Sequence, residues 1–208
     1  SASQNMQRLI AMESKVPTEK QRRGALSDDD FSAFTRGVGA ISRLPIWVLD
    51  SPGLTPEALR ARVKRLHAEH KLDLVMVDYL QLMTATRKDS NRVQEVSDIS
   101  RAMKQLAREL DVPVLAAAQL SRAVEQRQDK RPTLSDLRDS GALEQDADVV
   151  LFIYRDDYYN PNTDKKNQAD IIIAKHRNGP TGMVSLHFSR ELTRFSNLKR
   201  MPVDLAMA

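Results

Sequence analysis

The chain alternates between continuous apolar runs and segments in which apolar residues recur at helical spacing. The apolar runs predict β-strands at residues 44–49, 72–77, 112–119, 148–154, 169–175 and 183–188. Runs in which nearly every position is apolar are typical of strands covered on both faces, as in a parallel sheet. The short polar connections between the later runs instead predict antiparallel pairing at a late edge of the sheet.

Apolar residues at intervals of three or four positions predict helices at residues 1–15, 27–41, 55–66 and 93–110. Ser27 with an acid three residues later is a helix-start signal. Thr55 followed by Pro56 is a second one, with the proline at the first helical position. A strand, a helix and a strand in succession between residues 72 and 119 predict a parallel crossover, and the fold class is therefore α/β.

A polar residue comes at the end of each of the two central runs. Asp78 directly follows residues 72–77, and Gln119 closes residues 112–119. Open α/β sheets bind ligands at the carboxyl edge of their strands, and an acid there is typical of a Walker B strand, which helps to hold the Mg²⁺ of a nucleotide. A strand that merely ends in an acid, and an amide that caps a loop, are the structural alternatives.

Composition limits the class of protein. The 208 residues suffice for one domain with a full core, and 41% hydrophobic with 29% charged residues is ordinary for a globular protein. The absence of cysteine excludes disulfides and thiolate metal sites, and no apolar run has the length of a membrane span. The start of the chain lacks a signal-peptide pattern, so we expect residence in the cytoplasm without membrane partners.

The formal net charge of +4 favours a polyanionic partner. Basic residues gather in segments of loop character, namely Arg87, Lys88 and Arg92, residues 122–131, and Lys165 with Lys166. Residues 120–141 are mostly polar and form a longer connection than a compact domain usually keeps without a function, so we predict a binding loop there. Ordinary solvated loops are the alternative for all these segments.

Lys175 and Arg177 form a second candidate site at the end of a predicted strand. Being two residues apart, they point to the same side and are able to reach one anion together. A basic pair that solvates an edge turn is the alternative. The 4 histidines show no metal-ligand spacing with nearby carboxylates.

The sequence lacks one part that a Walker B strand requires. A nucleotide site normally has a glycine-rich loop ending in Gly-Lys-Ser/Thr, whose backbone amides surround the phosphates. None of the 7 glycines of this chain has that spacing. We therefore expect that the chain by itself does not close a conventional nucleotide site.

The candidate residues nevertheless occur in segments that resemble, in order, successive motifs of the bacterial replicative DNA helicases of the DnaB family. These segments are residues 74–82 (LVMVDYLQL), 116–122 (AAAQLSR), 137–148 (LRDSGALEQDAD) and 175–182 (KHRNGPTG). The resemblance implies a RecA-like three-layer core with a mostly parallel sheet and late antiparallel edge strands. It also implies that residues 1–196 are part of a helicase motor domain. Residues 197–208 are weakly patterned, and we expect them to be a C-terminal tail.

The resemblance assigns roles in ATP hydrolysis. Asp78 would be the Walker B carboxylate and would orient Mg²⁺ through water. Gln119 would be a sensor that contacts the γ-phosphate. Lys175 and Arg177 would project into the nucleotide site of the neighbouring subunit, with Arg177 as the arginine finger.

Contacts to single-stranded DNA are implied for Arg138, Asp139 and Gly141, and from a second loop for Arg87, Lys88 and Arg92. In such a loop, arginine supplies charge to a phosphate and glycine lets main-chain amides approach closely. Aromatic residues are absent from both loops, which does not favour stacking of bases.

The family further implies ATP and Mg²⁺ as cofactors, a homo-hexameric ring that moves 5′ to 3′ on single-stranded DNA, and primase and a helicase loader as partners. The phosphate loop and the catalytic glutamate would lie upstream of Ser1, so we expect this chain alone to be inactive. Two alternatives stay open: a noncatalytic DNA-binding or assembly module, and another RecA-like ATPase of the recombinase or clock type.

Overall fold

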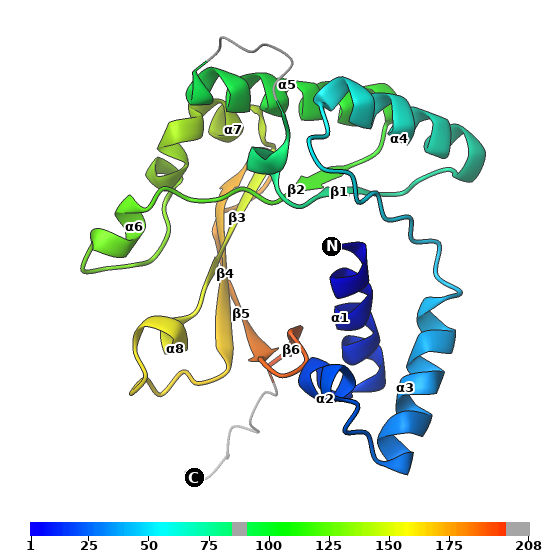
Figure 1. Ribbon diagram of the computed structural model, residues 1–208. Coiled ribbons are helices and arrows are strands. Elements are labelled where there is room, and N and C mark those ends of the chain that lie inside the picture. Colours follow the sequence, from blue (N-terminus) through cyan, green and yellow to red (C-terminus); the bar gives the residue numbers. More distant parts are fainter. Residues whose placement is uncertain (85–90, 199–208) are drawn as a thin grey trace, which may run out of the picture. The chain divides into compact units, whose positions relative to one another are not determined.

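The computed structural model describes residues 1–84 and 91–198, apart from the side chains of residues 138–140 (Figure 1). The chain divides into two compact units. Unit 1 comprises Ser1–Asp50, Ile153–Ile171 and Met183–Ala208, and unit 2 comprises Ser51–Phe152 and Ile172–Gly182. Helices and strands are interspersed between residues 75 and 176, with helices before and strands after, which confirms the α/β class. Among the helices of the described residues, none is long and apolar enough to cross a membrane.

Unit 2 is built on a parallel pair of strands. β1 (Val75–Val77) pairs with β2 (Val114–Ala116), and Val75 lies opposite Val114. The helix α5 (Arg92–Leu110) connects the two strands, so the predicted parallel crossover is confirmed. Each strand pairs over 3 residues only, which is shorter than the apolar run that predicted it.

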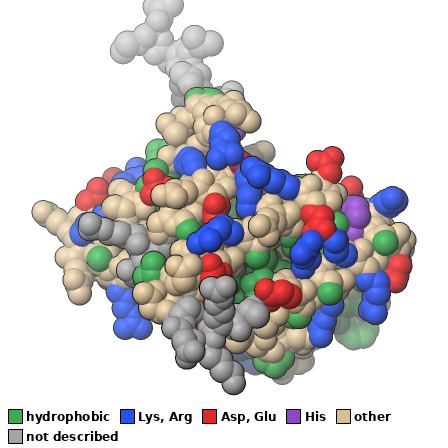
Figure 2. Space-filling view, turned by 90° about the horizontal axis from the view of Figure 1, so that it is seen from above, with side chains coloured by type: hydrophobic (Ala, Val, Ile, Leu, Met, Phe, Trp, Pro, Cys, Tyr) green, Lys and Arg blue, Asp and Glu red, His purple; other side chains and the backbone are tan. Residues whose placement is uncertain are grey.

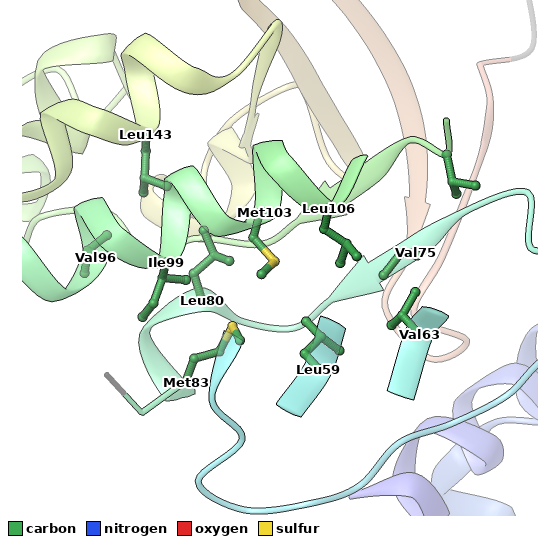
Figure 3. Packing of buried hydrophobic residues seen from close by; sticks show 11 residues of the cluster. Leu59, Val63, Val75, Leu80, Met83, Val96, Ile99, Met103, Leu106 and Leu143 are labelled. Carbon is green, nitrogen blue, oxygen red and sulfur yellow. The ribbon is translucent and has the colours of Figure 1, made fainter. Parts of the chain in front are cut away.

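Helices α4 (Pro56–His70) and α5 cover one face of this pair, with α7 (Gly141–Asp146) and the 3-10 helix η1 (Leu80–Leu82) beside them (Figures 1 and 3). Thr55 caps α4 through the Ala58 N–H, as predicted. The core contains Leu59, Val63, Val75, Leu80, Met83, Val96, Ile99, Met103, Leu106, Val112 and Leu143. The α5 members recur every three or four positions, which confirms the predicted helical periodicity.

Within unit 2, the opposite face of β1 and β2 carries exposed side chains. Met76 is 69% exposed and its register partner Leu115 is 49% exposed, whereas Val75 is 7% exposed. Successive side chains of a strand point to opposite faces, and only the face toward α4 and α5 is covered. The prediction that both faces are buried is therefore wrong for these strands.

Residues 44–49 do not form the predicted buried strand. The structure assigns them no strand, and Leu44, Ile46, Trp47, Val48 and Leu49 are 43% to 49% exposed. Apolar composition favours a strand only where a neighbouring strand supplies hydrogen bonds and a packed face. Within the described part of the chain, neither sheet includes residues 44–49.

The late strands form a 4-stranded sheet in the order β3 (Val149–Tyr154), β4 (Gln168–His176), β5 (Gly182–Ser189) and β6 (Arg194–Asn197). β5 and β6 are antiparallel, with Phe188 opposite Phe195. The Arg177 N–H donates to the Asp148 oxygen at 2.8 Å, so the end of β4 lies beside the start of β3, as antiparallel neighbours require. The predicted antiparallel edge is confirmed, whereas β6 and the short helix α8 (Asp156–Tyr159) were not predicted.

Residues 120–141 contain two short helical segments. These are α6 (Ala123–Gln126) and the 3-10 helix η2 (Leu134–Ser140). Leu137 of η2 is buried with Val150 and Phe152 of β3. Leu137 thus anchors this segment to β3.

The start of unit 1 is helical. It contains α1 (Ala2–Ser14), α2 (Thr18–Arg23) and α3 (Asp28–Ile41), of which only α2 was not predicted. Ser27 and Asp30 form the predicted capping box of α3. Gly37 is required by close packing of α3 on α1, because a Cβ there would lie 2.9 Å from the Ser14 Cβ.

We predict that Ile99→Ala lowers the free energy of unfolding of unit 2 by about 2 to 5 kcal/mol. Ile99 is 1% exposed on the buried face of α5, so the substitution leaves a cavity. Val93→Ala on the same helix, at a position 49% exposed, is expected to change it by less than about 1 kcal/mol. Denaturant unfolding of both variants measures the difference, and equal losses would contradict the assigned core face.

Candidate functional site at the carboxyl edge of the parallel strands

Asp78 and Gln119 follow β1 and β2 at the same edge of the parallel pair. The backbone places them there, because the Ala117 N–H donates to the Val77 oxygen at 2.8 Å and the Leu80 N–H donates to the Ala117 oxygen at 3.0 Å. Both side chains are exposed. The structure therefore brings together the two polar residues that end the predicted central strands.

Gln81 joins these two strand ends. Its Nε2 donates to the Gln119 oxygen at 3.1 Å, and its Oε1 accepts from the Gln119 N–H at 3.1 Å. One side-chain amide thus satisfies both main-chain groups of Gln119 and fixes the backbone from which that side chain projects. Gln81 lies in a segment that carries the family resemblance, but sequence reasoning gave it no role because its partner is 38 residues away.

Arg92, the first residue of α5, extends this hydrogen-bond network. Its Nη2 donates to the Gln81 main-chain oxygen at 2.6 Å, and its Nη1 pairs with Glu95 at 3.0 Å. These contacts occupy part of the guanidinium, so the predicted DNA contact of Arg92 stays a prediction. Arg87 and Lys88, predicted for the same channel, lie outside the described residues.

Lys175 and Arg177, at the end of β4 and in the turn after it, both contact the junction between α7 and β3. The Lys175 Nζ donates to the Glu144 oxygen at 2.5 Å. The Arg177 Nη1 pairs with the Asp148 Oδ1 at 2.9 Å. The two cations therefore lie on the same side of the strand end, as their spacing indicates.

Asp148 has a second cationic partner. Its Oδ2 accepts a hydrogen bond from the Lys104 Nζ, on α5. This hydrogen bond is the main reason that the pKa of the Asp148 carboxyl lies below its ordinary value, with further lowering by the charges of Arg177 and Arg108 and opposition from burial. Asp148 is therefore ionised at neutral pH and bridges α5 to the turn after β4.

A polar hollow of about 220 Å³ opens beside these contacts. It is lined by Arg101, Lys104, Gln105, Arg108, Gln145, Asp146 and Arg177. Basic side chains outnumber acidic ones in this lining, so an anion is the ligand that its charge favours.

The basic residues of α4 are in part neutralised within the protein. Lys and Arg side chains lie next to Asp and Glu side chains on the face shown in Figure 2. Arg60 of α4 donates from Nε to Glu109 of α5 at 2.7 Å, and Lys64 also contacts that carboxylate. The hydrogen bonds from Arg60 and Lys64 lower the pKa of Glu109 to about 2. This part of the surface is therefore a weaker candidate for a polyanion than its count of cations suggests.

The predicted DNA loop is held by a buried carboxylate. Asp136 is 5% exposed, accepts from the Thr133 N–H at 2.7 Å and pairs with Arg127 at 2.7 Å. Burial opposes ionisation, but these hydrogen bonds prevail and keep the pKa of Asp136 below its ordinary value. Arg138 and Asp139 belong to η2, and their side chains lie outside the described set.

Gly141 begins α7 and is exposed, and a Cβ there would meet no heavy atom within 4 Å. Packing within the described structure therefore does not require glycine at this position, and its predicted role toward DNA stays a prediction. Among the residues the structure describes, no group of three or more His, Cys, Asp or Glu is placed to hold a metal ion. Asp78 therefore belongs to no such group among the described residues.

Comparison with known proteins settles the family. The family model described as the DnaB-like helicase C terminal domain matches residues 1–197. The chain belongs to this family. The resemblance of its motifs to the DnaB family and the RecA-like α/β fold are thereby confirmed.

Curated relatives include the replicative DNA helicase DnaC of Bacillus subtilis, which is 49% identical over 200 residues, and the replicative DNA helicase DnaB of Geobacillus stearothermophilus, 49% identical over 201 residues. Each alignment covers 96% of this chain but 44% of the relative. The chain thus spans less than half the length of these replicative helicases.

Two solved structures superpose closely on this chain. One is described as a DnaB-like replicative helicase and its interactions with primase, with a TM-score of 0.92, 43% identity, and coverage of 96% of this chain and 48% of that one. The other is described as an ATPase domain, with a TM-score of 0.92 and 43% identity, and this chain covers 72% of it.

We predict that Gln81→Leu loosens the backbone at Gln119 without unfolding unit 2. Two hydrogen bonds are lost at an exposed edge, each worth about 1 kcal/mol, so amide exchange at Gln119 should accelerate roughly fivefold or more. Hydrogen exchange read by NMR or mass spectrometry measures this. Gln94→Leu, which removes an exposed amide on α5, serves as the control and should leave the exchange rate at Gln119 unchanged. An unchanged exchange rate at Gln119 in Gln81→Leu would show that the Gln81 side chain does not hold the Gln119 backbone.

Proposed function

We propose that this chain is part of the motor domain of a replicative DNA helicase that couples ATP hydrolysis to movement along single-stranded DNA. The observation that supports this most is the placement of Asp78 and Gln119 at the same edge of the parallel pair, where Gln81 binds the Gln119 backbone. A metal-orienting carboxylate and a phosphate-sensing amide need this adjacency, because both act on one nucleotide.

The position of Asp78 suits a carboxylate that orients the Mg²⁺ ion of a bound nucleotide. Its carboxylate is exposed at the carboxyl end of a parallel strand, where α/β sheets bind ligands. Mg²⁺ bound with ATP supplies positive charge that stabilises the charge developing on the phosphates during hydrolysis. Asp78 would orient this ion through water, and Gln119 would contact the γ-phosphate.

The phosphate side of the site is absent from this sequence, which has no loop ending in Gly-Lys-Ser/Thr. We place that loop, with the catalytic glutamate, upstream of Ser1 in the full-length helicase. The matched relatives, of which this chain covers 44%, are long enough to contain such a loop. This chain alone is then inactive.

Lys175 and Arg177 would act in the nucleotide site of the neighbouring subunit of a homo-hexamer. Both are held by the α7–β3 junction, and the Arg177 side chain is 48% exposed, so it remains accessible to a phosphate. A guanidinium suits this role because it presents several fixed donors and keeps its charge. Hydrolysis then depends on assembly of the ring.

Single-stranded DNA would be held through its backbone by Arg138, Asp139 and Gly141, with Arg87, Lys88 and Arg92 in a second loop. Such contacts carry no base sequence, which suits a motor that moves 5′ to 3′ over any template. Primase as a partner is supported by the structural relative that is described with its interactions with primase. A helicase loader and residence in the cytoplasm follow from the family alone.

One alternative is a noncatalytic DNA-binding or assembly module, which the missing phosphate loop favours. A recombinase or clock-type ATPase is a less suitable alternative, because the matched relatives are replicative helicases. ATP hydrolysis by the full-length helicase, with and without single-stranded DNA, separates these functions. Inactivity with retained DNA binding would support the noncatalytic module.

We predict that Arg177→Ala in the full-length helicase lowers DNA-stimulated ATP hydrolysis by at least about 10³-fold, the effect typical of a lost arginine finger. Arg65→Ala, at an exposed arginine of α4, is the matched control and should keep normal turnover. Steady-state ATPase assays, with ring assembly checked by light scattering, measure both. Normal turnover in an assembled Arg177→Ala ring would overturn the finger assignment.

We predict that binding of single-stranded DNA weakens with salt and that Arg138→Ala reduces the slope of log K against log salt by about 0.7, the value for one phosphate contact. The effect should be the same for different base sequences, since a backbone contact reads no bases. Fluorescence anisotropy titrations measure the slopes. An unchanged slope, equal to that of Arg65→Ala, would remove Arg138 from the DNA site.

A further inference from the structure

Asp148 contacts Arg177 in two ways. Its main-chain oxygen accepts the Arg177 N–H at 2.8 Å, and its Oδ1 pairs with the Arg177 Nη1 at 2.9 Å. Backbone and side chain of the arginine are therefore both set by one residue at the start of β3. An ion pair between two exposed side chains does not usually come with a backbone hydrogen bond between the same two residues.

The other oxygen of Asp148 is directed to α5. Oδ2 accepts a hydrogen bond from Lys104, whose side chain is 20% exposed. Lys104 therefore binds one oxygen of the carboxylate while Arg177 binds the other, and the two contacts together favour one orientation of the Asp148 side chain. Asp148 is thus a fixed support on which the Arg177 guanidinium rests.

The contact leaves most of the Arg177 guanidinium available. A guanidinium has five N–H donors, and the bond to Oδ1 uses one from Nη1. Arg177 also lines the basic hollow with Lys104 and Arg108. Asp148 therefore orients the arginine while leaving donors that face the place where an anion is favoured.

We propose that Asp148 is a positioning residue for Arg177: the carboxylate, itself fixed by Lys104, selects the rotamer in which the guanidinium reaches the nucleotide phosphates of the neighbouring subunit. The inference rests on the proposed trans-acting role of Arg177. In this role Asp148 acts only through the arginine.

The test uses Asp148→Asn, Asp148→Glu and Asp98→Asn in the full-length helicase. Asparagine keeps the size but removes the charge that attracts both cations. We expect Asp148→Asn to lower kcat for DNA-stimulated ATP hydrolysis about fivefold, the change in rotamer occupancy that an ion pair of half-exposed groups supports. KM for ATP should stay within about twofold, because the arginine acts on charge that develops during hydrolysis.

Asp148→Glu keeps the charge and should retain at least half of the normal kcat, which a purely structural requirement for aspartate would not allow. Asp98→Asn is the matched control, because Asp98 pairs with Arg101 at 3.6 Å, another arginine of the same hollow, without contacting Arg177. It should keep normal kcat. Thermal unfolding of each variant shows whether a loss of activity is a loss of fold.

Two failures are distinguishable. Normal kcat in Asp148→Asn, with Arg177→Ala inactive, overturns the positioning role and leaves the finger intact. Normal kcat in Arg177→Ala overturns the finger, and the positioning role falls with it. A loss of activity in Asp148→Asn that Asp148→Glu does not restore, or that appears as a raised KM, also contradicts positioning.

Discussion

The parallel pairing of β1 with β2 is the constraint on which the candidate site depends. The pairing aligns the ends of both strands, so Asp78 and Gln119 emerge at one edge although they are far apart in sequence. The cost of closing this long connection is offset by α5, whose buried face supplies Ile99 and Leu106 to the core. Gln81 then fixes the aligned ends to each other through the Gln119 backbone.

The parts of the fold that sequence reasoning predicted are those set by local interactions. Ser27 and Thr55 cap their helices through side chains that reach three residues ahead, and such contacts are written in the immediate sequence. Residues 44–49 failed because a strand needs a neighbour, and apolar composition does not say whether one is present. β6 was missed for the converse reason: it has little apolar pattern but pairs with β5.

In the candidate site, too, local features could be predicted from the sequence and long-range contacts could not. The spacing of Lys175 and Arg177 predicts that both point to one side, because strand geometry is local. Their partners could not be predicted, since the Glu144 carbonyl and the Asp148 carboxylate approach from 29 to 31 residues away only after β3 pairs with β4. The roles of these residues toward nucleotide and DNA remain predictions, because a fold places side chains without stating what they bind.

Asp157 and Asp148 each have two cationic partners, but their side chains differ in how deeply they are buried. Asp157 in unit 1 has a side chain 4% exposed, pairs with Arg155 and Arg190 and also accepts the Asn167 N–H, so its buried charge is satisfied by several partners at once. Asp148 is 53% exposed, so its pair with Arg177 is weak and exchangeable. Such a pair suits a positioning role, because it engages one donor of the Arg177 guanidinium and leaves the remaining donors exposed for an arriving phosphate.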